Sequence, residues 1–254
     1  MNVLLLLGTA HVLGDFLLQT DRLAAEKTKH ARKLLLHGLI YALVMGLVFL
    51  CGLSWRTGLA WAILGGSHLG IDALRVRIDR RLRKPGACLA SFCVDQALHL
   101  AGIAAVWLLL LRGHTAGLLA AGSAWLRPVL IYAALSCVIW KPAAVFIRLF
   151  FNCFFPEGEE SEEKTPPTNS VPGSGELIGK LERLIIAALV ICGQFGAIGF
   201  VLTAKSVARF KQIETDRGFA ERYLVGTLLS AGTALIAALI ATQLPGAALP
   251  VFPG

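Results

Sequence analysis

Three pairs of histidine and aspartate, each with a spacing of four residues, are the part of this sequence best suited to chemistry. Residues four apart on a helix lie on one face, about 6 Å apart along the axis. Each pair therefore places an imidazole and a carboxylate side by side within an apolar stretch of chain. The pairs are His11 and Asp15, His68 and Asp72, and Asp95 and His99.

The order of the two residue types reverses with the expected direction of the chain. The aspartate comes last in the first two pairs and first in the third pair. If the apolar segments alternate in direction across a membrane, all three aspartates lie at one depth, with their histidines one turn deeper. His37, at the start of another apolar segment, is expected near the aspartate layer.

Carboxylates and imidazoles gathered in this way suit a divalent metal, with Zn, Mn and Fe(II) as candidates. Such a metal lowers the pKa of bound water and polarises a phosphoryl or acyl oxygen. Gln19 and Gln96 are expected to hydrogen-bond to the ligands. The expected ligands are His11, Asp15, His68, Asp72, Asp95 and His99, and the expected catalytic groups are His37, Asp95 and Lys27.

A purely structural role for the same residues stays open. An ionised aspartate at the centre of a bilayer costs about 2.5–3.5 kcal/mol on insertion scales, so three of them need partners. Lys27, Arg75 and Arg77 are near enough in the sequence to pair with them. The aspartates could therefore be neutralised by Lys or Arg side chains, by protons or by a metal.

The composition indicates a membrane as the surroundings of these segments. Of the 254 residues, 56% are hydrophobic and 16% charged, and the mean hydropathy is +0.69. Soluble domains carry about 25% charged residues, so an ordinary soluble or disordered chain is excluded. A spanning helix needs about 20 mostly apolar residues. The sequence predicts an all-α, multi-pass transmembrane helical bundle with six or seven spans, at 2–20, 34–53, 58–75, 92–111, 128–151, 184–203 and 222–243.

The basic loops predict the orientation of this bundle. Segment 21–33 carries five Lys or Arg and segment 75–84 carries six. The positive-inside rule places both in the cytoplasm and the N-terminus outside. Counting simple spans then puts the basic segment 204–222 outside, against the rule. A re-entrant break at 140–142, where Pro142 interrupts an apolar run, would restore the parity.

An acidic segment divides the chain into two parts. Residues 156–175 contain five Glu among Pro, Ser and Gly, a composition that cannot bury a core. The predicted organisation is an N-terminal membrane bundle with the His/Asp site at 1–155, a linker at 156–175 and a C-terminal helical pair at 176–254.

Several function classes find no support in the sequence. The six cysteines form no C-x-x-C pair, which argues against a disulfide framework or a zinc knuckle. No P-loop, GxGxxG, GxSxG, HExxH or EF-hand pattern is present. The net charge of +8 lies between apolar runs, a pattern typical of membrane orientation and not of nucleic-acid binding. Membrane lipids are the expected partners, and the oligomeric state stays open. Lipid or substrate contacts are expected at Arg75, Lys205 and Arg209.

The same motifs carry a resemblance to a known family. HxxxDFxxQ at 11–19, Lys27, His37, HxxxD at 68–72 and DQxxH at 95–99 resemble the bacterial membrane proteins catalogued as domain of unknown function 3307. The resemblance covers roughly residues 1–110 and implies a location in the bacterial inner membrane. Similarity to the longer members of the family extends to 175–183, 197–200, 204–210 and 226–230.

A looser similarity links these motifs to membrane-bound metal-dependent hydrolases, which place HxxxD pairs in short helical spans. It implies hydrolysis of a lipid-linked or phosphate-bearing substrate as the leading hypothesis. A proton-coupled transporter or channel is the first alternative, because intramembrane Asp and His also form proton relays. A membrane scaffold with structural His/Asp pairs is the second. A transport site is expected near the midplane, so aspartates at one edge favour the hydrolase.

Overall fold

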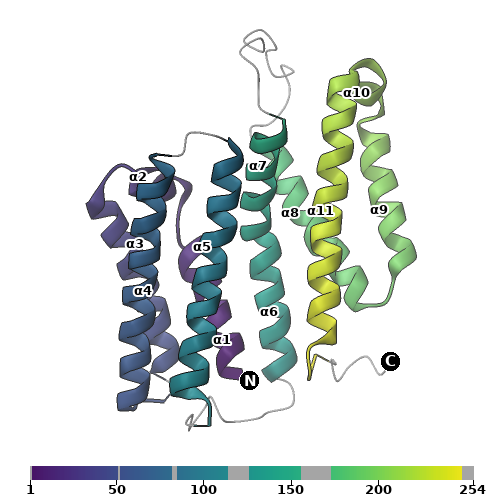
Figure 1. The fold of residues 1–254 in the computed structure, drawn as a ribbon. Helices are drawn as coiled ribbons and strands as arrows, with labels where there is room; N and C mark the ends of the chain where they lie inside the picture. Colours follow the sequence, from purple (N-terminus) through teal and green to yellow (C-terminus); the bar gives the residue numbers. More distant parts are fainter. Residues whose placement is uncertain (1, 51, 82–84, 114–125, 156–172, 248–254) are drawn as a thin grey trace.

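The computed structural model describes residues 2–50, 52–81, 85–113, 126–155 and 173–247, and these form helices packed side by side (Figure 1). The all-α prediction is confirmed for the described residues. In chain order the helices are α1 (Asn2–Val12), η1 (Leu13–Leu17), α2 (Asp21–Lys27), α3 (Ala31–Phe49), α4 (Trp55–Asp79), α5 (Pro85–Val106), η2 (Trp107–Leu111), α6 (Leu126–Trp140), α7 (Pro142–Phe154), α8 (Ser174–Ile191), α9 (Phe195–Ala208), α10 (Phe210–Thr215) and α11 (Arg217–Gln243).

Four helical segments within the described ranges are long and apolar enough to cross a membrane. A fifth crossing results if the bent pair Val3–Leu17 and Asp21–Lys27 counts as one span. These helices are consistent with a membrane protein, but the predicted count of six or seven spans is not confirmed. The four segments are Ala31–Phe49, Gly86–Leu111, Leu126–Phe154 and Arg217–Gln243.

Two predicted spans differ from the helices observed. The segment 58–75 lies within the continuous helix α4, but its polar and charged residues, such as His68 and Asp72, keep α4 out of the apolar set. The segment 184–203 is not one helix, because α8 ends at Ile191 and α9 begins at Phe195. Gly193 between them has a φ of 70°, in the left-handed region where glycine commonly ends a helix.

This break makes α8 and α9 a hairpin that begins and ends at one end of the bundle (Figure 1). The basic segment 204–222 consequently lies at the same end as α2 and the C-terminal end of α4. The helix break at residues 192–194 thus brings the basic segments to one end without a re-entrant break at 140–142. Helices α6 and α7 instead continue as one span of 29 residues.

Two apolar clusters hold the helices together. The first joins α1, α3, α4 and α5 through side chains such as Leu7, Met45 and Ile103. The second joins α6, α8 and α11, where alanines of α11 such as Ala234 allow close helix packing. Helix α6 therefore belongs to the second cluster, although the sequence groups it with the N-terminal bundle. The predicted domain boundaries stay predictions, and residues 156–172 of the linker lie outside the described ranges.

A sharp bend near the N-terminus positions the first part of the His/Asp site. The π-helical turn η1 carries Asp15, and the axis of α2 lies at 83° to that of the segment before it. Thr20 caps α2 by accepting a hydrogen bond from the Leu23 amide at 3.2 Å. Lys141 Nζ donates to the Gln19 carbonyl at the bend, at 2.6 Å. The bend turns α2 back across the bundle, so Lys27 reaches the aspartates.

Candidate metal centre

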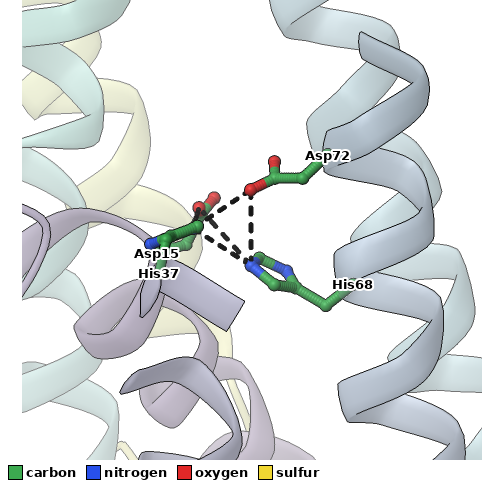
Figure 2. Close-up of side chains that lie close together, drawn as sticks. All are labelled: Asp15, His37, His68 and Asp72. Atoms are coloured by element: carbon green, nitrogen blue, oxygen red, sulfur yellow. Dashed lines mark hydrogen bonds and ion pairs between the residues drawn. The ribbon is translucent and has the colours of Figure 1, made fainter. Parts of the chain in front are cut away.

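Four side chains from three helices converge in the interior near the basic end of the bundle. Asp15 lies on η1, His37 on α3, and His68 and Asp72 on α4. Figure 2 shows them pointing toward one another. All four are at most 5% exposed. We refer to Asp15, His37, His68 and Asp72 as the four-residue cluster.

The His37 Nε2 atom is the centre of this cluster. It lies 3.2 Å from Asp15 Oδ1, 3.1 Å from Asp72 Oδ2 and 3.2 Å from His68 Nε2. His68 Nε2 in turn lies 3.9 Å from Asp15 Oδ1 and 3.8 Å from Asp72 Oδ2. Four ligands bound tetrahedrally at about 2.0–2.2 Å are separated from one another by about 3.3–3.6 Å. The cluster is therefore close to the geometry of a tetrahedral metal site.

A second group of potential ligands shares Asp72 with the first. Asp72, Asp95 and His99 each offer a ligand atom, and these atoms lie within 4.8 Å of one another. Asp95 Oδ1 is buried and has no hydrogen-bond partner among the described residues. The arrangement can accommodate one metal with a nearby free carboxylate oxygen, or two metals bridged by Asp72.

Hydrogen bonds determine which nitrogen of His99 carries its proton. His99 Nδ1 lies 2.8 Å from the carbonyl oxygen of Asp95, which can only accept, so Nδ1 is protonated. The Nε2 atom then has a free lone pair. It is buried and has no hydrogen-bond partner within the described part of the chain. His99 is therefore held in the tautomer that a metal ligand or a general base requires.

Gln96 connects His11 to two of the aspartates through hydrogen bonds. Its amide nitrogen donates to Asp15 Oδ2 and to Asp95 Oδ2, each at 3.0 Å. Its oxygen lies 3.3 Å from His11 Nε2 and accepts that proton. His11 was expected to be a ligand from its spacing, but it lies in neither ligand group. It donates a hydrogen bond to Gln96 instead. His37, expected as a catalytic group, occupies a ligand position.

Two cations neutralise part of the negative charge at the site. Lys27 Nζ donates to Asp72 Oδ2 and to Gln19 Oε1, each at 2.9 Å. Arg75 Nη1 donates to Asp95 Oδ2 at 2.9 Å. These ion pairs are the contacts that a structural role for Asp72 and Asp95 predicts.

Asp15 is different, because no Lys or Arg of the described ranges forms an ion pair with it. Its carboxylate oxygens contact only His37 and Gln96 at hydrogen-bond distance. Three buried aspartates thus face two paired cations. With neutral histidines, one buried negative charge is left without a paired cation, which is unfavourable.

Aromatic rings close the site on its deep side. The Tyr41 ring stacks on the His68 ring with centroids 3.6 Å apart and planes 3° apart. The rings of His11 and His99 stack beneath, with centroids 5.2 Å apart. Gly14 allows this packing, because a Cβ there would lie 3.1 Å from the Tyr41 ring. The sequence analysis missed Tyr41, although its position one helical turn after His37 was the available signal.

A cavity of about 200 Å³ connects the ligands with the basic end of the protein. Asp15 and Asp72 line it together with Gln19. Its cationic lining residues are Lys27, Arg75, Lys141 and Arg148. Asp21 and Asp79 also line the cavity, so its four cations lie beside four carboxylates. The cations offer charge-assisted hydrogen bonds to an anion such as a phosphate ester.

Two residues expected to contact lipid or substrate lie away from this site. Lys205 on α9 forms an ion pair with Glu182 on α8 at 2.5 Å. The Arg209 guanidinium lies 5.9 Å from the centre of the Phe219 ring. Both belong to the C-terminal helices, whereas Arg75 lines the cavity beside the cluster.

The comparison with protein families gives a match to the N-terminal part of the chain. Residues 3–125 match the family described as "Protein of unknown function (DUF3307)". This part of the chain is similar to the members of that family. The match includes α1 to η2, and with them every residue of both ligand groups. It extends beyond residue 110, whereas the similarity noted after residue 175 lies outside it.

The other comparisons give no information on function. No curated protein matches the chain, and no solved structure does. The looser similarity to metal-dependent hydrolases is not shown by any of them. The functional argument for this protein therefore depends on its own side chains.

Proposed function

We propose that this protein is a metal-dependent hydrolase of the bacterial inner membrane that acts on a phosphate-bearing or lipid-linked substrate. The observation that carries the proposal is the convergence of four buried ligand atoms in the four-residue cluster, where Asp15 has no Lys or Arg partner among the described residues. A divalent metal would supply the missing charge and use ligands of the kind that Zn, Mn and Fe(II) prefer.

The residues around the four-residue cluster have distinct roles in this proposal. A metal held by these residues would supply a water of lowered pKa and polarise a phosphoryl oxygen. Asp95, with its free Oδ1, accepts the proton of the attacking water. Lys27 and Arg75, which line the cavity, hold the anionic oxygens of the substrate. Gln96 keeps Asp15 and Asp95 at a fixed separation.

Replacing Asp95 by Asn tests this chemistry. We expect phosphate release to fall by about 100-fold or more, because a general base contributes on the order of 10²–10⁴ to the rate. The measurement follows inorganic phosphate released by the metal-loaded protein from phosphatidic acid, an isoprenyl diphosphate and a water-soluble aryl phosphate.

The matched control for this assay is Glu26→Gln. Glu26 is a carboxylate at the same end of the bundle that pairs with Arg22 and Lys33 and lines neither the cavity nor the cluster. It should release phosphate at the parent rate. Equal rates for the parent and Asp95→Asn, with metal content unchanged, would contradict the assigned role of Asp95.

The proposed orientation places the cavity at the cytoplasmic face. It is supported by the hairpin of α8 and α9, which gathers the basic segments 21–33, 75–81 and 204–222 at one end. In spheroplasts, an impermeant thiol reagent should label Leu53→Cys and leave Arg32→Cys and Lys211→Cys unlabelled. The three variants are made in a chain whose native cysteines are replaced by serine or alanine, and permeabilised cells show that each site can react.

Labelling of Lys211→Cys from outside, together with Leu53→Cys, would show that the α8–α9 hairpin crosses the membrane. That result would contradict the proposed topology. All three residues are exposed in the structure, and labelling in permeabilised cells shows that each can react, so the comparison reports sidedness.

A proton pathway is the competing function, and the ring stack of the histidines favours it. The His68 ring lies 4.5 Å from the His99 ring, which in turn lies 5.2 Å from that of His11, so titratable groups continue toward the interior. The test measures proton flux in liposomes. If the metal-free protein conducts protons as fast as the metal-loaded protein, and His99→Gln abolishes the flux, the result would support the pathway and count against the hydrolase.

A further inference from the structure

A second cavity, of about 320 Å³, lies between α7 and the C-terminal helices α8, α9 and α11. Its cationic lining residues outnumber its acidic ones by four to two. The cations are Lys141, Arg148, Arg183 and Lys205, and the carboxylates are Asp21 and Glu176. Because Lys141 and Arg148 also line the cavity of the His/Asp site, the two cavities adjoin.

Arg183 is the unusual residue of this second cavity. It is only 3% exposed, so its guanidinium lies in the interior between α6, α8 and α11. Its Nε donates to the Ile139 carbonyl at 2.7 Å, and its Nη1 donates to Ser230 Oγ at 3.2 Å. Its Nη2 is buried and has no hydrogen-bond partner among the residues described.

No carboxylate of the described chain forms an ion pair with Arg183. The adjacent Glu182 pairs with Lys205, and the two carboxylates of the cavity wall are also engaged. Asp21 Oδ1 lies 3.6 Å from Lys141 Nζ, and Glu176 Oε1 lies 2.6 Å from Lys180 Nζ. A buried guanidinium with free N–H groups and no counterion is a binding site for an anion, and its planar fork matches the oxygens of a phosphate.

Arg148 supplies a second cation at the opening of the same cavity. Its side chain is exposed and forms no ion pair or hydrogen bond with the described residues. Gly226 and Ser230 line the α11 side of the cavity, and Gly226 allows α11 to pack closely on α7, since a Cβ there would lie 3.2 Å from the Phe151 ring. An anion in the cavity would therefore meet one buried and one exposed guanidinium.

We infer that this cavity binds a phosphate group through Arg183 and Arg148, either the phosphodiester of a membrane phospholipid or free phosphate. The site lies outside the His/Asp cluster and does not depend on the proposed hydrolase activity. Arg183 bonds to Ile139 and Ser230 near the middle of their helical spans. Arg148 lies nearer the basic end of the span Leu126–Phe154, where an anion would enter at the height of lipid headgroups.

The test uses the full chain in detergent, with its metal site disabled by Asp15→Asn so that binding at the cluster does not contribute. Native mass spectrometry measures binding of phosphatidylglycerol against phosphatidylcholine, and calorimetry measures binding of inorganic phosphate. We expect preferential binding of one of the two anions, weakened roughly tenfold or more by Arg148→Gln and by Arg183→Gln, because each removes a charge-assisted hydrogen bond.

Arg217→Gln is the matched control, since Arg217 is an exposed arginine at the same end, paired with Glu221. It should bind like the parent. Arg148→Gln removes no contact within the described fold, so the test stands even if Arg183→Gln does not fold. Selective phosphatidylglycerol binding identifies the lipid as the source, and phosphate binding alone identifies a soluble anion. Absence of both, or equal weakening by Arg217→Gln, would overturn the inference.

Discussion

Replacing Asp15 by Asn is expected to abolish metal binding while the metal-free protein stays as stable as the parent. Asp15 contributes one of four converging ligand atoms, yet no Lys or Arg of the described chain forms an ion pair with it. Asparagine keeps the size of the side chain and an oxygen to accept from Gln96. It removes a buried negative charge that, without metal, repels Asp72.

Metal content and thermal stability of the same preparations measure both halves of this expectation. The parent should retain a transition metal, and Asp15→Asn should lose more affinity than the roughly 10–100-fold that follows loss of a ligand's hydrogen-bond partner. The protein is purified without a His-tag, reconstituted with Zn, Mn or Fe(II), and analysed by mass spectrometry of the elements.

The matched control for metal content is Asp79→Asn. It is the same substitution in the same cavity, but Asp79 belongs to neither ligand group. It should retain the parent's metal. If the unsubstituted protein binds none of the three metals, the result would contradict both the metal centre and the proposed hydrolase activity.

Replacing Asp72 by Asn is expected to have the opposite effect on the metal-free protein and to lower its Tm by about 10 °C. Asp72 is 1% exposed and its partner Lys27 is 8% exposed. Removal of one member of a buried ion pair costs about 3–5 kcal/mol, because the other charge is left uncompensated. For a chain of this size each kcal/mol lowers the Tm by about 2–4 °C.

The double variant Lys27→Met, Asp72→Asn distinguishes the loss of the ion pair from the cost of leaving Lys27 buried without a partner. It leaves no unpaired ammonium in the interior, so most of the lost Tm should return. Thermal scans of chelated samples, followed by tryptophan fluorescence, measure the three proteins. The exposed pair of Arg217 and Glu221 gives the control, since Glu221→Gln should shift the Tm by no more than about 2 °C. If the single and double variants have the same Tm, the unpaired Lys27 ammonium is not the cause of the lost stability.

These two experiments also distinguish the functions weighed for the site. A scaffold predicts loss of stability at each aspartate, whereas a metal centre predicts that Asp15 and Asp72 behave differently without metal. The difference arises from one contact, the 2.9 Å ion pair that Lys27 makes with Asp72 and not with Asp15.

The local features of this protein could be predicted from its sequence. Helical segments follow from apolar runs, and the spacing of four residues places His68 and Asp72 on one face of α4, because both depend only on helix geometry. Alternation of helix direction was sufficient to expect the aspartates in one layer. The structure brings Asp15, Asp72 and Asp95 together at the basic end of the bundle.

The identity of the converging atoms was decided only by the tertiary structure. His37 enters the four-residue cluster because α3 packs between η1 and α4, whereas His11 turns to Gln96 on α5. The number of spans could not be predicted either, because the glycine at 193 permits a left-handed turn without requiring one. The burial of Arg183 also could not be predicted, because only the packing of α6, α8 and α11 leaves its guanidinium in the interior without a counterion. Helix periodicity is a property of neighbouring residues, but a binding site depends on which distant helices pack together and at what rotation.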